Sequence, residues 1–227
     1  MSLFPCEIVD DGSRTPLIET PAGVLHTRIV AGPLDTGTTP ATLTGTTSRG
    51  QRLSRWTCSH ADAELLVHEI TPSLPPEMRV DGCVAAVWRV RAHVDIVAFL
   101  AECQFDPIAE PDGGPTSGEG LDAQTWRVGP DVISVGTEDG EMLSIRAERN
   151  ALMPSRLQHD LGLTTVISTS RGLRIPFSSL RASETLQVHF VVSWVRTEDD
   201  ERSATWFAVD QPWHRILEGT GCDERAA

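Results

Sequence analysis

Residues 184–210 read ETLQVHFVVSWVRTEDDERSATWFAVD, and this stretch decides the fold class. From Thr185 to Trp194 apolar and polar side chains alternate, which is typical of a strand with one buried face. The charged run RTEDDERS then predicts the tip of a β-hairpin, with ATWFAVD as the returning strand. In that hairpin Trp194 would lie opposite Trp206, and the acidic residues at 198–201 would form a solvated tip.

Short strand patterns separated by turn residues continue through most of the chain. Strands are expected at 21–30, 41–44, 52–57, 84–93, 125–128, 131–136, 141–148, 163–169 and 172–177. Asp139-Gly140 is a strong hairpin signal, so 125–148 predicts an antiparallel meander. Together these patterns predict a mainly β fold, an antiparallel sandwich or a strongly bent sheet with two or three short helices, with an α+β fold as the alternative.

The helical patterns are few and short. Ser59 and Asp62 form a capping-box arrangement that predicts a helix ending before Pro72. Asp95 could cap a second helix, and a continued buried strand is the competing interpretation. Shorter helices are expected at 155–161 and at 211–219, after Pro154 and around Pro212.

Residues Asp106–Gly120 are rich in proline and glycine, which predicts a long loop or linker that divides the chain into two halves. The first half has too few strands to close a sheet of its own. We therefore expect a single domain over 1–227, with 106–120 as a disordered or lid-like loop.

Composition narrows the setting and the classes of chemistry. The five cysteines are odd in number and form no CxxC pair, so neither a disulfide framework nor a zinc site is indicated, and a cytoplasmic location is expected. No apolar run is long enough to span a membrane. A net charge of −13 repels nucleic-acid backbones, which argues against a nucleic-acid partner.

Lysine is absent, and all nineteen basic residues are arginine, as a GC-rich bacterial genome would favour. Without lysine the chain has no Schiff-base amine and no phosphate-binding lysine of the P-loop or kinase type. GxSxG, HExxH and GxGxxG are missing as well, so no cofactor is expected.

The segment WRVRAH places Arg89, Arg91 and His93 on one face of a predicted strand, opposite Trp88 and Val90. Three potential cations in a row on an acidic chain predict a site for a carboxylate or phosphate, if the surface they line is concave. A polar sheet face paired with neighbouring acids is the alternative.

Cys58, His60, Glu64 and His68 would lie close together around the helix predicted at 59–70. A thiol beside a histidine suggests a nucleophile with its base, and His/Glu/His suggests a metal site, although neither has a recognised spacing. Cys58, His60 and His68 are therefore weak catalytic candidates, and no metal site is assigned.

Three functions of different class are compatible with these residues. The leading hypothesis is a non-catalytic module that binds a small anion through Arg89, Arg91 and His93, or binds a protein partner through the acidic tip. The second is an enzyme without a familiar signature, either a thiol hydrolase or a hydrolase that uses a histidine–carboxylate metal site. The third is a structural or assembly subunit, such as a homodimer formed through a sheet edge.

Overall fold

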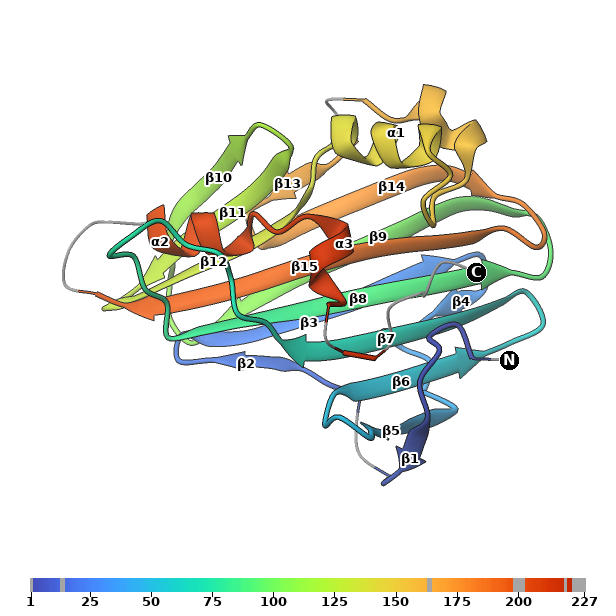
Figure 1. The fold of residues 1–227 in the computed structure, drawn as a ribbon, viewed down its shortest axis with the longest axis horizontal. Helices are drawn as coiled ribbons and strands as arrows, with labels where there is room; N and C mark the ends of the chain where they lie inside the picture. The colour runs from blue at the N-terminus through green and yellow to red at the C-terminus, as the bar shows by residue number, and fades with distance from the viewer. Residues whose placement is uncertain (1, 13–14, 163–164, 198–202, 219, 222–227) are drawn as a thin grey trace.

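The computed structural model describes residues 2–12, 15–162, 165–197, 203–218 and 220–221, which form two antiparallel sheets packed face to face (Figure 1). The larger sheet has nine strands in the order β1 (Ile8–Asp10), β5 (Leu43–Thr47), β6 (Arg52–Thr57), β7 (Ala61–Glu69), β8 (Gly82–Ala92), β15 (Thr185–Arg196), β12 (Asp131–Glu138), β11 (Leu121–Val128) and β10 (Asp112–Gly118). The smaller sheet has the order β13 (Ile167–Thr169), β14 (Gly172–Leu180), β9 (Ile96–Pro107), β3 (Gly23–Ala31) and β2 (Ile18–Thr20), and β4 (Leu34–Asp35) also pairs with β3. The predicted mainly β sandwich is confirmed.

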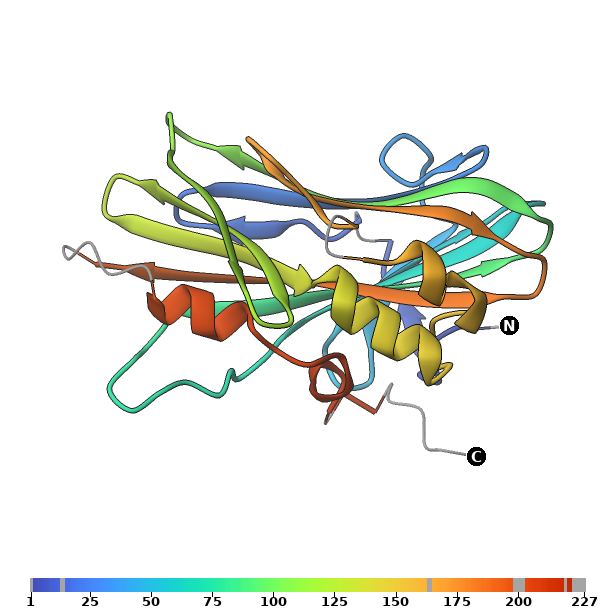
Figure 2. The same cartoon turned by 90° about the horizontal axis from the view of Figure 1, so that it is seen from above.

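The described helices are short and lie outside the two sheets. They are α1 (Gly140–Glu148), the 3-10 helix η1 (Ser155–Asp160), α2 (Ser203–Val209) and α3 (Trp213–Ile216). Figure 2 shows α2 and α3 against the outer face of the larger sheet, while α1 and η1 pack together at one rim. None of the described helices is long and apolar enough to cross a membrane.

The alternation of apolar and polar residues predicted for β15 is confirmed, and both faces of the strand are buried. Four of its apolar residues enter the core between the sheets, namely Leu186, Val188, Phe190 and Val192. The rings of Trp56 and Trp88, whose centroids are 5.2 Å apart, belong to the same core. The opposite face of β15 carries Gln187, His189, Val191 and Ser193, and the N- and C-terminal segments cover part of that outer face. The larger sheet is therefore buried on both sides near its middle.

The predicted hairpin at 184–210 is wrong in its second half. β8 and β12 take the two edges of β15, so no edge remains along 191–194 for a returning strand. Residues Ser203–Val209 form α2 instead, and Trp194 lies opposite Gly82 and Ile133 rather than Trp206. The proposed acidic tip at 198–201 lies outside the described residues.

Two predicted helices are strands in the structure. The segment after Ser59 forms β7, which pairs with β8 along its whole length and with β6 over residues 62–67. Both faces of β7 are buried, and this buried-strand pattern of apolar residues cannot be distinguished from a helix by periodicity. The segment after Asp95 forms β9, as the competing interpretation had it. The short helices expected at 155–161 and 211–219 are confirmed as η1 and α3.

The Asp139-Gly140 pair begins a helix and not the predicted hairpin. Asp139 is the N-cap of α1, and its Oδ1 accepts a hydrogen bond from the Met142 backbone N–H at 2.8 Å. Glycine is required at 140 by close approach, because a Cβ there would lie 1.7 Å from the Gly162 carbonyl oxygen. The strand expected at 141–148 is therefore α1.

We expect Asp139→Ala to lower the free energy of unfolding by roughly 0.5–2 kcal/mol, because the first turn of α1 loses its cap. Urea unfolding monitored by circular dichroism would measure the loss. Asp139→Asn keeps a capping oxygen and is the matched control, with a smaller loss expected. Equal losses in the two variants would contradict the capping role.

The Pro/Gly-rich stretch 106–120 is not the continuous loop that its composition predicted. Asp112–Gly118 forms β10, which pairs with β11 and ends the larger sheet. As the outermost strand, β10 can carry Pro115 because only one of its edges is paired. The core between the sheets includes residues from Ile18 to Val192, on both sides of this stretch. The single-domain interpretation stays a prediction.

Candidate functional site

A hollow lies at the end of β7 in the larger sheet and extends to residues 17–19 at β2 of the smaller sheet. It has a volume of about 860 Å³, and two hollows of about 470 and 290 Å³ adjoin it. All three share Glu69, and the first two also share His68 and Glu218. We call this joined space the His68 cleft. Its walls come from 17–19 at β2, from 49–52 at the start of β6, from 67–73, from Val84 and Trp194, and from Gln211, Arg215, Ile216, Glu218 and Thr220.

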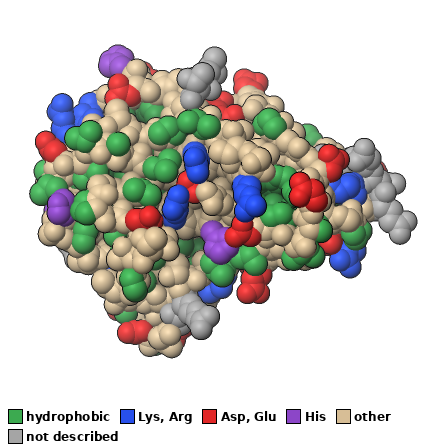
Figure 3. Space-filling view, turned by 180° about the vertical axis from the view of Figure 1, so that it is seen from behind, with side chains coloured by type: hydrophobic (Ala, Val, Ile, Leu, Met, Phe, Trp, Pro, Cys, Tyr) green, Lys and Arg blue, Asp and Glu red, His purple; other side chains and the backbone are tan. Residues whose placement is uncertain are grey.

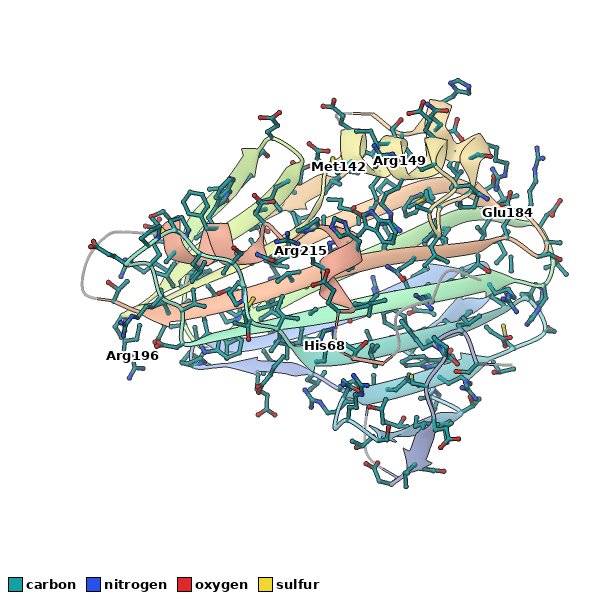
Figure 4. The ribbon with its side chains drawn as sticks, in the orientation of Figure 1. His68, Met142, Arg149, Glu184, Arg196 and Arg215 are labelled. Atoms are coloured by element: carbon teal, nitrogen blue, oxygen red, sulfur yellow. The ribbon has the colours of Figure 1, made fainter. Side chains whose placement is uncertain are left out.

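Charged side chains of both signs line the His68 cleft. They are Arg49, Arg52 and Arg215 together with Glu19, Glu69 and Glu218. The Arg52 Nη2 donates to the Leu17 carbonyl at 3.0 Å, which ties this exposed guanidinium to β2. The Arg215 side chain is exposed and makes no ion pair with the described residues. Figure 4 shows that Arg215 comes from α3 and His68 from the strand beneath it.

His68 is a buried polar residue of the cleft, at 9% exposure. Burial lowers the pKa of its imidazole, and the carbonyls of Glu69 and Ile216 oppose that shift without overcoming it. Nδ1 lies 3.0 Å from the Glu69 carbonyl oxygen, so in the neutral ring Nδ1 carries the proton and donates it. Nε2 then has a free lone pair and forms no hydrogen bond with any described residue.

The weak catalytic candidates do not come together. Cys58 and His60 lie at the turn that precedes β7, whereas His68 is near the far end of the strand. Eight residues of extended chain separate the two histidines, or roughly 26 Å, where a helix would have brought them within about 12 Å. In the described part of the chain, no group of three His, Cys, Asp or Glu residues is placed to hold a metal ion.

The three predicted anion-binding residues share the outer face of the larger sheet, and each contacts a protein group. Arg89 is buried, and its Nε donates to Gln187 Oε1 at 2.8 Å. The Arg91 Nε lies 3.3 Å from Thr185 Oγ1. His93 Nε2 lies 3.2 Å from the Asp62 carboxylate. This contact is of the kind that the alternative prediction describes, a polar sheet face paired with neighbouring acids. Binding of an anion by these residues stays a prediction.

Sequence reasoning missed a buried charged group on the same sheet face, next to α1. Arg146 of α1 forms an ion pair with Glu138 of β12 at 2.5 Å and donates to the Gln187 carbonyl at 3.0 Å. His189 of β15 lies beside them, with Nδ1 3.9 Å from the Glu138 carboxylate. Burial lowers the pKa of His189 to about 4, with the positive charge of Arg146 acting in the same direction and Glu138 opposing it. The contacts of Arg146 hold α1 against the larger sheet.

No described helix covers the outer face of the smaller sheet, and several charged residues on that face pair with one another. Figure 3 shows arginine, acidic and histidine side chains mixed over the middle of this side. Arg28 and Arg174 both pair with the buried Glu102, at 3.2 and 3.0 Å. Asp106 contacts both Arg171 and His26 at 3.2 Å. Because these charges satisfy one another, the His68 cleft is the better candidate site.

Comparison with known proteins does not identify the chain. No family model matches the sequence, and no curated protein matches it either. Among solved structures, a chain described as "Putative kojibiose phosphorylase from human microbiome" aligns with a TM-score of 0.47 and 8% identity. The alignment covers 80% of this chain and 24% of that chain. At this level the similarity carries no argument about function.

Proposed function

We propose that the chain is a non-catalytic binding module that holds a small anionic ligand in the His68 cleft. The observation that carries the proposal is the position of Arg52 and Arg215, two exposed guanidinium groups that line two adjoining hollows, both of which are also lined by the buried His68. A guanidinium presents a planar fork of donors that suits carboxylate and phosphate groups. The first hollow of the cleft, with a volume of about 860 Å³, lies in the range of small-molecule sites.

The remaining wall of the cleft favours a ligand that also carries hydroxyl groups. The carboxylates of Glu19, Glu69 and Glu218 accept hydrogen bonds. A bare inorganic anion would leave these acceptors without donors and would meet the repulsion of three carboxylates. A hydroxylated carboxylate or phosphate ester, with its anionic group toward the arginines, would satisfy both parts of the wall.

We expect a hydroxylated anion to raise the melting temperature by roughly 5–10 °C at a hundred times its Kd, because it binds only the folded chain. Differential scanning fluorimetry with citrate, gluconate and glycerol phosphate would measure the shift, with sodium chloride at equal ionic strength as the reference. Arg52→Ala and Arg215→Ala should each weaken binding about tenfold or more, since each removes a charge-assisted hydrogen bond.

Arg149→Ala is the matched control, because Arg149 is also exposed and makes no side-chain ion pair with the described residues. It lowers the net charge equally and follows the last turn of α1, away from the cleft lining (Figure 4). The proposal fails if none of the anions shifts the melting temperature. It also fails if Arg149→Ala weakens binding as much as the two cleft variants do.

A further inference from the structure

The segment Ser2–Phe4 lies on the outer face of the larger sheet in the way a bound peptide would. The backbone N–H groups of Leu3 and Phe4 both donate to Glu64 Oε2, at 2.9 and 2.8 Å. The Leu3 carbonyl accepts a hydrogen bond from Arg89 Nη1 at 2.9 Å. Glu64 and Arg89 therefore recognise the main chain of this segment, both its donors and its acceptor.

The sheet also contacts one side chain of this segment specifically. Phe4 is fully buried, and its ring belongs to the apolar cluster that includes Leu66 and Val87 on the sheet face. The guanidinium carbon of Arg89 lies 4.5 Å from the centroid of the ring, which is a cation–π contact. The site thus has a specific place for an aromatic residue directly after the residue whose carbonyl it holds.

The two recognition groups are positioned by the sheet itself. Glu64 and Arg89 lie directly opposite each other in the register of β7 and β8. Arg55 donates to the second oxygen of Glu64 at 2.5 Å, and Gln187 holds the Nε of Arg89 at 2.8 Å. Since these partners belong to neighbouring strands, the site keeps its shape independently of Ser2–Phe4.

We propose that Glu64 and Arg89 form a recognition site for an extended, uncharged peptide with an aromatic residue, and that Ser2–Phe4 fills this site in cis. An uncharged peptide fits because its backbone supplies both the two N–H donors that Glu64 accepts and the carbonyl that Arg89 binds. The site is separate from the His68 cleft and does not depend on the function proposed for it. In this proposal Arg89 binds a peptide carbonyl and an aromatic ring. The sequence had instead predicted that Arg89 binds a small anion.

The test uses the full chain and the peptide acetyl-Ser-Leu-Phe-amide, with a fluorophore on a C-terminal linker. In the wild type the attached segment competes at an effective concentration in the millimolar range, so little binding is expected below about 1 mM. Phe4→Ala empties the aromatic position, and fluorescence anisotropy should then show binding at least tenfold tighter. The peptide should also raise the melting temperature of this variant. Val9→Ala, at an exposed position on β1, is the matched control and should behave as the wild type does.

Two altered peptides separate backbone recognition from non-specific adhesion. N-methylation of the phenylalanine nitrogen removes a hydrogen bond to Glu64, and replacement of phenylalanine by alanine removes the ring. Each change should weaken binding to the Phe4→Ala protein at least tenfold. If Phe4→Ala does not fold, Phe4→Leu keeps an apolar side chain and removes the cation–π contact. The proposal is overturned if the parent peptide does not bind the folded variant, or if the N-methylated peptide binds equally well.

Discussion

Replacing Arg146 with methionine is expected to lower the free energy of unfolding by roughly 3–5 kcal/mol, because it removes one partner of a buried ion pair. The Arg146 side chain is 1% exposed and pairs with Glu138, which is 5% exposed. Methionine fills much of the same volume, so the loss comes mainly from the Glu138 carboxylate and the Gln187 carbonyl left without their donor. Urea unfolding at pH 7 would measure it.

A double-mutant cycle tests whether the loss belongs to the pair. In Glu138→Gln/Arg146→Met no charge is left buried, so we expect the double variant to lose less than the sum of the two single losses, by about 1–3 kcal/mol. Arg149→Met is the control, since Arg149 is exposed beside the same helix and should change stability by no more than about 0.5 kcal/mol. Additive losses would show that the ion pair is not the cause.

The strands that could be predicted are those whose two faces differ in sequence. β15 alternates apolar and polar residues over most of its length, and β6 has the predicted bounds. β7 could not be predicted in the same way, because Leu65 and Leu66 are buried on opposite faces and the pattern carries no period. Local cap signals at Ser59 and Asp62 then favoured a helix, and pairing with β6 and β8 overrode them.

The candidate site was predictable only in part, because segments far apart in the sequence form it. The sequence drew attention to His68, but it placed this residue beside Cys58 instead of beside Arg52 and Arg215. The position of Arg146 depended on reading 141–148 as a helix, because only then does its side chain reach Glu138 of β12 and the Gln187 carbonyl of β15. Gln187 lies in the part of β15 that precedes its pairing with β12. No local pattern reports this register, which follows from how the two strands pair.

Acid is expected to destabilise the fold through His189 by roughly 3 kcal/mol in all, because the pKa of this residue falls from 6.5 to about 4 on folding. Above pH 6.5 the ring is neutral in both states and contributes nothing to the pH dependence. Between pH 6.5 and 4 the unfolded chain binds a proton that the folded chain does not, so stability falls as the pH falls. Below pH 4 both states are protonated, and the loss from this group is complete.

Urea unfolding from pH 7.5 to 4.5 would compare the wild type with His189→Gln, which cannot titrate in this range. At pH 7.5 the difference between them gives the cost of the substitution without ionisation, and towards pH 4.5 the wild type should lose most of that 3 kcal/mol relative to the variant. His68, whose pKa burial also lowers, destabilises in the same direction but is present in both proteins, so it cancels. Parallel stability curves would contradict a buried neutral His189.

An NMR titration would measure the pKa of His189 directly. The His189 ring signals should stay constant down to about pH 5 and then move as the ring is protonated beside Arg146.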